Sequence, residues 1–334
     1  MKKLVCIFLT LILFVFAGCS QTPADVTPTP EAPQSTPTAE AYVGIDINIG
    51  ALKGPTGMGF SKLMTDAQNK KTANNYDIEL FADPTEIPAL LKKGELDIAA
   101  IPTNLAANLY NKNDGNVQLL ALNTLGVLYI IEKGDTIKSV KDLEGKKICS
   151  FGKSATPEFA LKYVLKQENI NCEVEFYDAT ALAAMAKNGT ADVILVPEPQ
   201  VTTLIMNNPD FRVALDFNEV WNEACDNSAL LSMGCLAIRK EFAQNNPKAV
   251  EKFLEEYSAS VAFVNANVDE AATMIESFGI VPKAAIAKKA IPNSKIVAIY
   301  GDDMKAKTQA FLQILFESEP ASIGNAVPGE DFYY

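Results

Sequence analysis

The sequence predicts an α/β fold with two similar lobes, because one structural unit occurs twice along the chain. Residues 87–105 and 182–200 can be laid over each other so that four pairs of positions match: Gly94 with Gly189, Asp97 with Asp192, Ile98 with Val193, and Pro102 with Pro197. Each copy has a short amphipathic helix ended by Gly, then an Asp, an apolar strand and a Pro, which is the helix–strand–helix pattern of a parallel α/β sheet. The upstream stretches also match, because turn residues precede both copies, at 54–57 and at 153–157. A length of 334 residues leaves room for two domains.

The amino-terminal residues have the pattern of an export signal followed by a tether. Lys2 and Lys3 precede an apolar run at residues 4–16, and small residues lead to Cys19. This order is typical of a signal peptide, and the run is too short for a stable membrane span. It resembles a bacterial lipoprotein signal, which implies removal of residues 1–18 and lipidation of Cys19. The following residues, 19–41, are rich in Thr, Pro, Ala and Glu, so we expect a disordered tether.

The first lobe is expected to begin with a strand at 43–52, a glycine-rich turn and a helix at 60–70. Free N–H groups at such a helix start can hold a ligand oxygen, although an ordinary tight turn has the same pattern. Thr103 and Asn104 are expected to cap a later helix that runs to about residue 110. The other expected elements of this part are strands 76–81, 96–101, 117–122 and 125–132 and the helix 84–93.

The second lobe is expected to repeat this order. Residues 154–157 should cap a helix at 158–168, and Pro157 suits its first turn because the missing N–H costs nothing there. The other expected elements are strands 146–151, 172–177, 191–196 and 211–215, a helix 181–187 and a helix ending at residue 207.

The pattern breaks between residues 218 and 231, where the single tryptophan, Trp221, lies. A strand is expected at 232–238. The remainder should be a helical carboxyl-terminal segment, with helices 248–265, 268–278, 282–288 and 303–317.

Composition excludes several functions. A net charge of −12 and a pI near 4.7 argue against a nucleic-acid partner, which requires a basic face. Because the chain has no His, a zinc site or a Cys–His nucleophile is not expected, and neither is a resident cofactor. The four cysteines of the body are either small buried hydrophobes or two disulfides, which an extracytoplasmic location permits. Those disulfides would pair Cys149 with Cys172 and Cys225 with Cys235.

Two segments, 143–148 and 235–254, carry a resemblance to a known family. The first reads Leu-Glu-Gly-Lys-Lys-Ile before a strand and a capped helix, and the second is an apolar strand that leads into a long helix. In these segments the chain resembles the solute-binding proteins of ABC importers, in the group that serves nitrate, sulfonates, taurine and pyrimidine thiamine precursors. The resemblance implies the two-lobed periplasmic-binding-protein type II fold, with hinge crossings at 124–133 and 231–239. Lobe one would comprise 43–125 plus 235–334, and lobe two 130–232.

The candidate site follows from the expected sheets, because ligands of parallel α/β sheets bind outside the carboxyl ends of the strands. The residues at those ends, at the hinge entry and in the irregular segment are the predicted ligand contacts: Gly54, Pro55, Thr56, Gly57, Met58, Thr103, Asn104, Asn123, Thr124, Ser154, Ala155, Thr156, Glu198, Gln200 and Trp221.

The chemistry of the solute is only partly indicated by these residues. The chain has two arginines, Arg212 and Arg239, and neither lies at a strand end of lobe one, so a guanidinium clamp on an anion is not expected. If Glu198 faces the cleft, it favours a donor-rich solute; otherwise it is an acid in the first turn of a helix. Aromatic side chains such as Trp221 and Tyr129 either stack on a heterocycle or belong to the core. The prediction is a neutral or weakly charged heterocycle.

The resemblance implies a monomeric extracytoplasmic protein, anchored through lipidated Cys19 to the outer face of the cell membrane, that delivers a small molecule to an ABC permease and its ATPase. Two other functions use the same fold or anchor: a solute-sensing surface lipoprotein without a transporter, and an enzyme of thiamine-pyrimidine or menaquinone synthesis. The sequence offers no histidine for acid–base catalysis and no Gly-x-Ser-x-Gly turn, so we expect no enzymatic activity.

Overall fold

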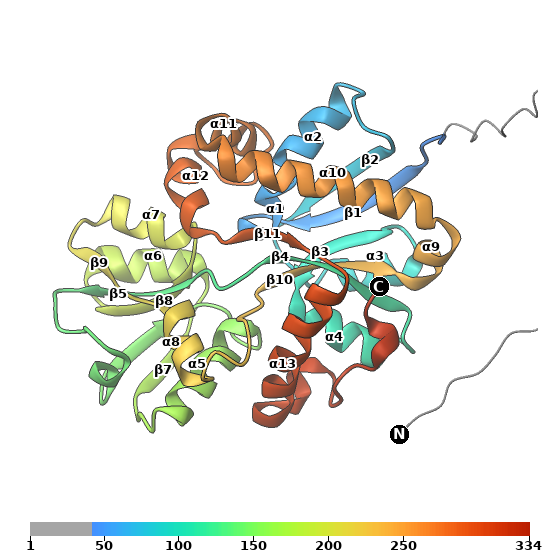
Figure 1. Ribbon diagram of the computed structural model, residues 1–334. Helices are drawn as coiled ribbons and strands as arrows, with labels where there is room; N and C mark the ends of the chain where they lie inside the picture. The colour runs from blue at the N-terminus through green and yellow to red at the C-terminus, as the bar shows by residue number, and fades with distance from the viewer. Residues whose placement is uncertain (1–41) are drawn as a thin grey trace, which may run out of the picture. The chain divides into compact units, whose positions relative to one another are not determined.

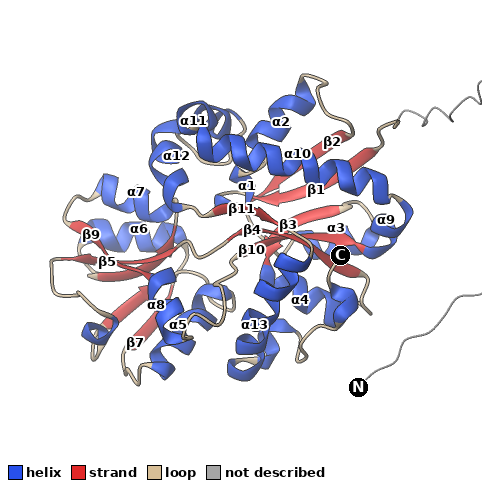
Figure 2. Cartoon of the chain, viewed as in Figure 1, coloured by secondary structure: helices blue, strands red, loops and turns tan. Residues whose placement is uncertain are grey.

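The computed structural model describes residues 42–334 of the chain. The predicted signal at 1–18, the lipidation site Cys19 and the tether at 19–41 lie outside the described residues. Within 42–334 the strands form a six-stranded sheet, in the order β11-β4-β10-β3-β1-β2, and a five-stranded sheet, in the order β7-β6-β8-β5-β9. Figures 1 and 2 show both sheets with the helices that cover them. We call the part built on the six-stranded sheet lobe one and the other part lobe two.

Lobe one contains strands β1 (Asp46–Leu52), β2 (Asn75–Phe81), β3 (Ile98–Pro102), β4 (Val117–Thr124), β10 (Gly234–Arg239) and β11 (Ile296–Ile299). As predicted, β1 pairs in parallel with β2 and β3. The late strand β10 is antiparallel to both β3 and β4, because it returns from lobe two in the opposite direction.

Lobe two contains strands β5 (Leu128–Lys133), β6 (Lys147–Ser150), β7 (Glu173–Phe176), β8 (Val193–Pro197) and β9 (Phe211–Asp216). Here β6 is parallel to β7 and β8, and β5, which enters from lobe one, is antiparallel to β8 and β9. The chain thus crosses between the sheets twice, from β4 to β5 and again before β10.

Helices cover both faces of each sheet. Lobe one carries α1 (Pro55–Met58), α2 (Ser61–Gln68), α3 (Ile87–Lys93), α4 (Thr103–Lys112), α9 (Lys240–Asn245), α10 (Pro247–Ala266), α11 (Val268–Ser277), α12 (Ala284–Ala290) and α13 (Asp302–Ser318). Lobe two carries α5 (Thr156–Gln167), α6 (Ala179–Asn188), α7 (Gln200–Asn207) and α8 (Phe217–Ala224). Alternate residues of β3 show the two faces: Ile98 belongs to the core cluster that includes Phe253 of α10, and Ile101 to the cluster that includes Leu312 of α13. This alternation is what a sheet buried on both sides requires.

The repeated unit is present in both lobes. Helix α3 ends at Gly94 and helix α6 ends at Gly189, with φ angles of 75° and 68°. Both glycines adopt the left-handed conformation that commonly ends a helix, which Gly reaches without a Cβ penalty. The strands that follow, β3 and β8, each end at the matched proline.

Several elements differ from the sequence prediction. The short helix α1 occupies the expected glycine-rich turn, and α8, α9 and β11 were not expected. Residues 217–224, which lie almost entirely in the segment expected to be irregular, form α8, capped by the Asp216 side chain, which accepts a hydrogen bond from Asn218 N. A strand, β11, lies in the segment expected to be helical and pairs at the sheet edge with β4 alone. It is four residues long, too short for an alternating pattern to stand out.

The four cysteines of the body are free thiols, so neither proposed disulfide forms here. The register of β6 and β7 places Cys149 opposite Glu175 rather than near Cys172. Cys225 caps α8 in lobe two, whereas Cys235 lies in β10 of lobe one. The small buried hydrophobe is therefore the alternative that fits Cys149, Cys225 and Cys235, all at most 5% exposed.

The lobes also share apolar packing. One cluster of buried side chains continues from Leu119 of lobe one to Ile130 and Trp221 of lobe two. The ring of Trp221 lies 5.8 Å from that of Phe311 on α13, measured between centroids. None of the helices between residues 42 and 334 is long and apolar enough to cross a membrane.

Candidate functional site

A cavity of about 340 Å³ lies where the strands of both sheets end. The carboxyl ends of β1 and β3 reach it from lobe one, and those of β6 and β8 reach it from lobe two, as expected for ligand sites of α/β sheets. Its lining consists of Leu52, Lys53, Gly54, Pro55, Thr56, Ala82, Pro84, Pro102, Thr124, Val127, Phe151, Gly152, Lys153, Ala155, Thr156, Pro157, Pro197, Glu198, Gln200 and Met233. We call this cavity the interlobe cleft.

The structure brings eight of the predicted contacts together in the interlobe cleft: Gly54, Pro55, Thr56, Thr124, Ala155, Thr156, Glu198 and Gln200. Two glycines shape its edges. Gly54 and Gly152 follow β1 and β6 and have φ angles of 90° and 85°. Residues other than Gly rarely adopt this backbone conformation. The role of the eight predicted contacts in binding a solute stays a prediction.

The other predicted contacts lie outside the cleft lining. Gly57 and Met58 are buried within α1, Thr103 shares a hydrogen bond with the Ser232 hydroxyl at 2.8 Å, and the Asn123 amide donates to the Thr56 carbonyl at 3.0 Å. Of these residues, Asn123 is thus bonded to the backbone of one that lines the cleft, Thr56.

Asn104 and Ser154 line a different groove between the lobes, of about 380 Å³. Asn104 is also engaged across the lobes, because the Thr156 hydroxyl donates to its Oδ1 at 3.0 Å in a buried bond. Asn104 and Thr156, which were both expected to bind a solute, thus form a hydrogen bond with each other.

Trp221 lies in the core and does not line the cleft. It is fully buried, its indole N–H donates to the Ala229 carbonyl at 2.8 Å, and its ring packs 5.0 Å from that of Tyr163. The alternative of a core aromatic is the one that fits. The segment 218–231 was expected to be irregular, so α8, which holds Trp221 in the core, was not predicted.

Both arginines are engaged far from the cleft, each with a buried carboxylate. Arg239 donates to Asp97 Oδ1 at 2.7 Å in lobe one, and Arg212 donates to Glu132 in lobe two. No guanidinium is among the side chains that line the cleft.

The cationic groups of the cleft are instead two lysines, which the sequence reasoning missed. Lys53 comes from lobe one and Lys153 from lobe two. Each is adjacent to one of the edge glycines, Gly54 and Gly152, and this matched position was a signal that could have identified them.

Glu198 is the buried charge of the cleft, with 2% of its surface exposed. Its Oε1 accepts from the Thr202 hydroxyl at 3.0 Å, and its Oε2 accepts from the Thr202 N–H at 3.2 Å. Burial raises the pKa of this carboxyl above its ordinary value of 4.5, although the bonds from Thr202 oppose the change.

We expect Glu198→Gln to become more stable relative to the native protein as pH rises above about 4.5. Since the folded state holds the Glu198 proton more tightly than the unfolded state, its stabilising contribution is present at acidic pH and is lost as pH rises through the folded pKa. A tenfold difference in proton affinity corresponds to about 1.4 kcal/mol. Urea unfolding across this pH range measures the difference, with Glu223→Gln, an exposed glutamate on α8, as the control. A constant difference between native protein and Glu198→Gln would contradict the raised pKa.

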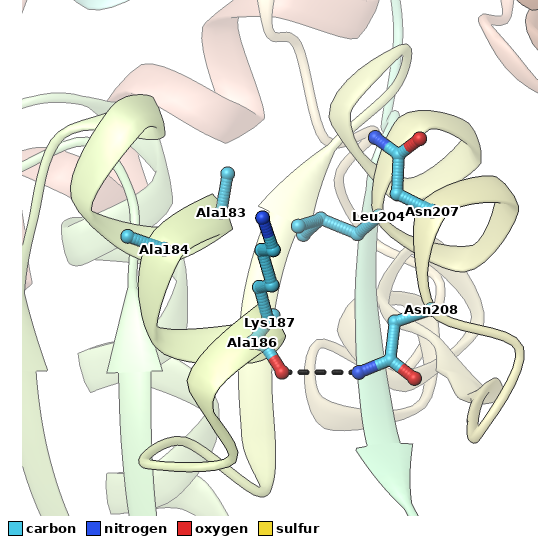
Figure 3. A pocket seen from close by; sticks show the side chains of 7 residues that line it. All are labelled: Ala183, Ala184, Ala186, Lys187, Leu204, Asn207 and Asn208. Carbon is cyan, nitrogen blue, oxygen red and sulfur yellow. Dashed lines mark hydrogen bonds between the residues drawn. The ribbon is translucent and has the colours of Figure 1, made fainter.

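A larger hollow, of about 450 Å³, lies on lobe two alone between α6 and α7. Figure 3 shows its lining of alanines with Lys187, Leu204, Asn207 and Asn208, whose amide donates to the Ala186 carbonyl at 3.0 Å. Only one lobe contributes to this hollow, and it is not at the strand ends. We therefore take the interlobe cleft as the candidate site.

Several solved structures share this fold. An ABC transporter protein from Parabacteroides distasonis has a TM-score of 0.73 at 22% identity, over 86% of this chain and 98% of that one. The periplasmic aliphatic sulphonate binding protein SsuA from Escherichia coli has a TM-score of 0.69 at 14% identity, over 86% and 92%. The periplasmic nitrate-binding protein NrtA from Synechocystis has a TM-score of 0.56 at 13% identity, over 86% and 83%. The predicted two-lobed periplasmic-binding-protein type II fold is therefore confirmed.

No curated protein matches the sequence. A family described as menaquinone biosynthesis matches residues 60–291, which is more than half of the 334 residues. The match spans strands of both sheets and every segment that lines the cleft except 52–56. The chain therefore belongs to the menaquinone biosynthesis family.

Proposed function

We propose that this protein is the extracytoplasmic solute-binding component of an ABC importer. The observation that carries the proposal is the interlobe cleft, which takes its lining from the strand ends of both lobes. A solute held there touches both lobes at once, so it stabilises the arrangement in which they face each other, and binding is coupled to a hinge motion. The hinge consists of the segments 124–133 and 231–239, between lobe one at 43–125 plus 235–334 and lobe two at 130–232.

The likeness to ABC-transporter, sulphonate-binding and nitrate-binding proteins supports this proposal at the level of the fold. The partners are a small molecule, a permease and its ATPase, and the protein acts as a monomer. The amino-terminal pattern supports attachment to the outer face of the membrane through Cys19.

Thermal unfolding of the full chain against a panel of solutes tests the binding step. The panel contains sulfonates, nitrate, pyrimidines, flavins and aromatic acids. A ligand that binds only the folded state raises the melting temperature by mass action. Uptake of the solute that gives a shift is then measured in cells with and without the protein. Lost uptake supports import, whereas binding with unchanged uptake supports a sensor.

An enzyme is the second candidate, and the family match favours it. The carboxyl of Glu198, buried beside the cleft with a raised pKa, has the character of a general acid or base. The purified protein is incubated with each solute that gives a thermal shift, and the solute is analysed by mass spectrometry. Recovery of unchanged solute supports the binding protein, and a new product that disappears in Glu198→Gln supports the enzyme.

We expect Cys19→Ala to release the protein from the membrane or to leave its signal uncut, because lipidation requires the thiol. Membrane fractionation and the mass of the mature amino terminus measure the effect. The control is Cys172→Ala, a partly exposed free thiol of lobe two, which should mature normally. Normal membrane-bound maturation of Cys19→Ala would contradict the lipoprotein proposal.

A further inference from the structure

We propose that the groove of about 380 Å³ lined by Asn104 and Ser154 is a second ligand site, which binds a small hydroxylated amine. We call it the second groove. Helix α4 and the 3₁₀ turn Pro320–Ile323 line it from lobe one, and Ser154 with α5 lines it from lobe two. Figure 1 shows α5 close to α13, the helix that precedes this turn. The second groove shares no lining residue with the interlobe cleft, so this site is additional to the proposed function and does not depend on it.

The Ser322 hydroxyl is the group that points to a ligand. Ser322 lines the second groove and is 7% exposed, and its Oγ has no hydrogen-bond partner among residues 42–334. A buried hydroxyl is costly to leave unpaired, and folded proteins contain few such groups. The backbone of this residue is held in place, because its carbonyl accepts from the Asn104 amide at 3.3 Å. A ligand in the groove is therefore placed to supply the partner that the fold does not provide.

Other polar groups of the second groove have unused acceptor atoms. The Asn108 amide nitrogen donates to the Ala321 carbonyl at 3.2 Å, and its Oδ1 accepts no hydrogen bond from a described residue. The backbone N–H of Ser154 donates to Glu158 Oε2 at 2.6 Å, whereas its hydroxyl has no partner between residues 42 and 334. A ligand with several O–H or N–H donors would satisfy these oxygens.

The charges of the second groove favour an amine. Lys162 pairs with Glu158 Oε1 at 2.6 Å, so these two lining charges offset each other. Lys153, which acts on Glu158 from the interlobe cleft, does not line the groove. Glu319 is partly exposed, and its carboxylate forms no ion pair or hydrogen bond within the described part of the chain. An ammonium group is attracted to this carboxylate and carries three donors of its own.

Four matched probes test this site on the full chain by thermal unfolding and calorimetry. Glucosamine has the amine and the hydroxyls, glucose lacks the amine, cyclohexylamine lacks the hydroxyls, and glucuronate carries the opposite charge. Leu105 and Phe159 give the groove an apolar surface for the ring carbons that all four share. We expect glucosamine to bind about tenfold more tightly than glucose or cyclohexylamine, as the loss of one charge-assisted contact or of several neutral ones implies. Glucuronate should give no shift.

Ser322→Ala separates a ligand contact from a structural role. It should weaken the binding of glucosamine without lowering the melting temperature of the free protein, because it removes a hydroxyl that has no partner. Glu319→Gln should remove the preference for glucosamine over glucose. Glu317→Gln is the matched control, because this glutamate is exposed at the end of α13 and does not line the groove; it should leave the preference intact.

Glucosamine binding that is unchanged in both Ser322→Ala and Glu319→Gln, or that is lost in Thr56→Val instead, would overturn the second site. The latter result would place the ligand in the interlobe cleft. No shift with glucosamine, or tighter binding of glucuronate, would also overturn it. The proposed function is tested by solute uptake, so its failure can be told apart from each of these outcomes.

Discussion

Trp221→Ala is expected to destabilise the protein by about 3–5 kcal/mol, as for other large buried aromatics cut to Ala. The indole is fully buried between Tyr163 of its own lobe and Phe311 of the other. The substitution opens a cavity in the cluster that joins the lobes and leaves the Ala229 carbonyl without its donor. Urea unfolding followed by circular dichroism measures the loss, because this tryptophan is the only one in the chain and its fluorescence disappears with it.

Tyr300→Ala is the control, because this side chain is 43% exposed and its loss should change the stability by no more than about 0.5 kcal/mol. A Trp221→Ala protein of unchanged stability that no longer binds solute would contradict the core placement. It would restore the tryptophan to the ligand site.

Glu132→Gln is expected to lower the free energy of unfolding by about 1–3 kcal/mol, because it removes a buried carboxylate that accepts several hydrogen bonds, one of them from an arginine that is only one-third exposed. Glu132 is 1% exposed and accepts hydrogen bonds from Ile137 N at 3.0 Å and from the Thr136 hydroxyl at 3.0 Å as well as from Arg212. Burial alone would raise the pKa of this carboxyl, but these bonds and the Arg212 charge lower it below its ordinary value of 4.5.

The lowered pKa sets the pH dependence of the effect. The stabilisation is fully present above pH 4.5 and is lost as pH falls through the folded pKa, so the difference between native protein and Glu132→Gln should shrink in acid. Asp135→Asn is the matched control: Asp135 lies 3.0 Å from the same guanidinium, but its side chain is 71% exposed. Its loss should destabilise the protein much less than the loss of Glu132, because exposed ion pairs contribute little to stability. Equal losses for both variants would contradict the importance of burial for this pair.

Trp221 and Arg212 show the limit of predicting the site from the sequence. Trp221 attracted a functional interpretation because it is the single tryptophan of the chain, whereas no ligand role was predicted for Arg212. In the structure both side chains contact other residues of the protein and do not line the interlobe cleft. Trp221 fills a gap between helices. Arg212 pairs with the buried carboxylate of Glu132, which lies 80 positions earlier in the chain, a separation over which no local pattern extends.

Local patterns in the chain were enough to predict the repeated unit, most strands along the chain and the two-lobed fold, because hydrophobic periodicity, helix-ending glycines and strand-ending prolines are local properties. Eight of the predicted contact residues also line the interlobe cleft, since strand ends converge wherever parallel strands share a sheet edge; their role in binding stays a prediction. The side chains that face the cleft, and those that bond to each other, could be identified only in the folded protein. Thr156 and Asn104 meet across the lobes, and Lys53 and Lys153 reach the lining, because side-chain direction and pairing depend on neighbours that the fold, and not the chain order, brings together.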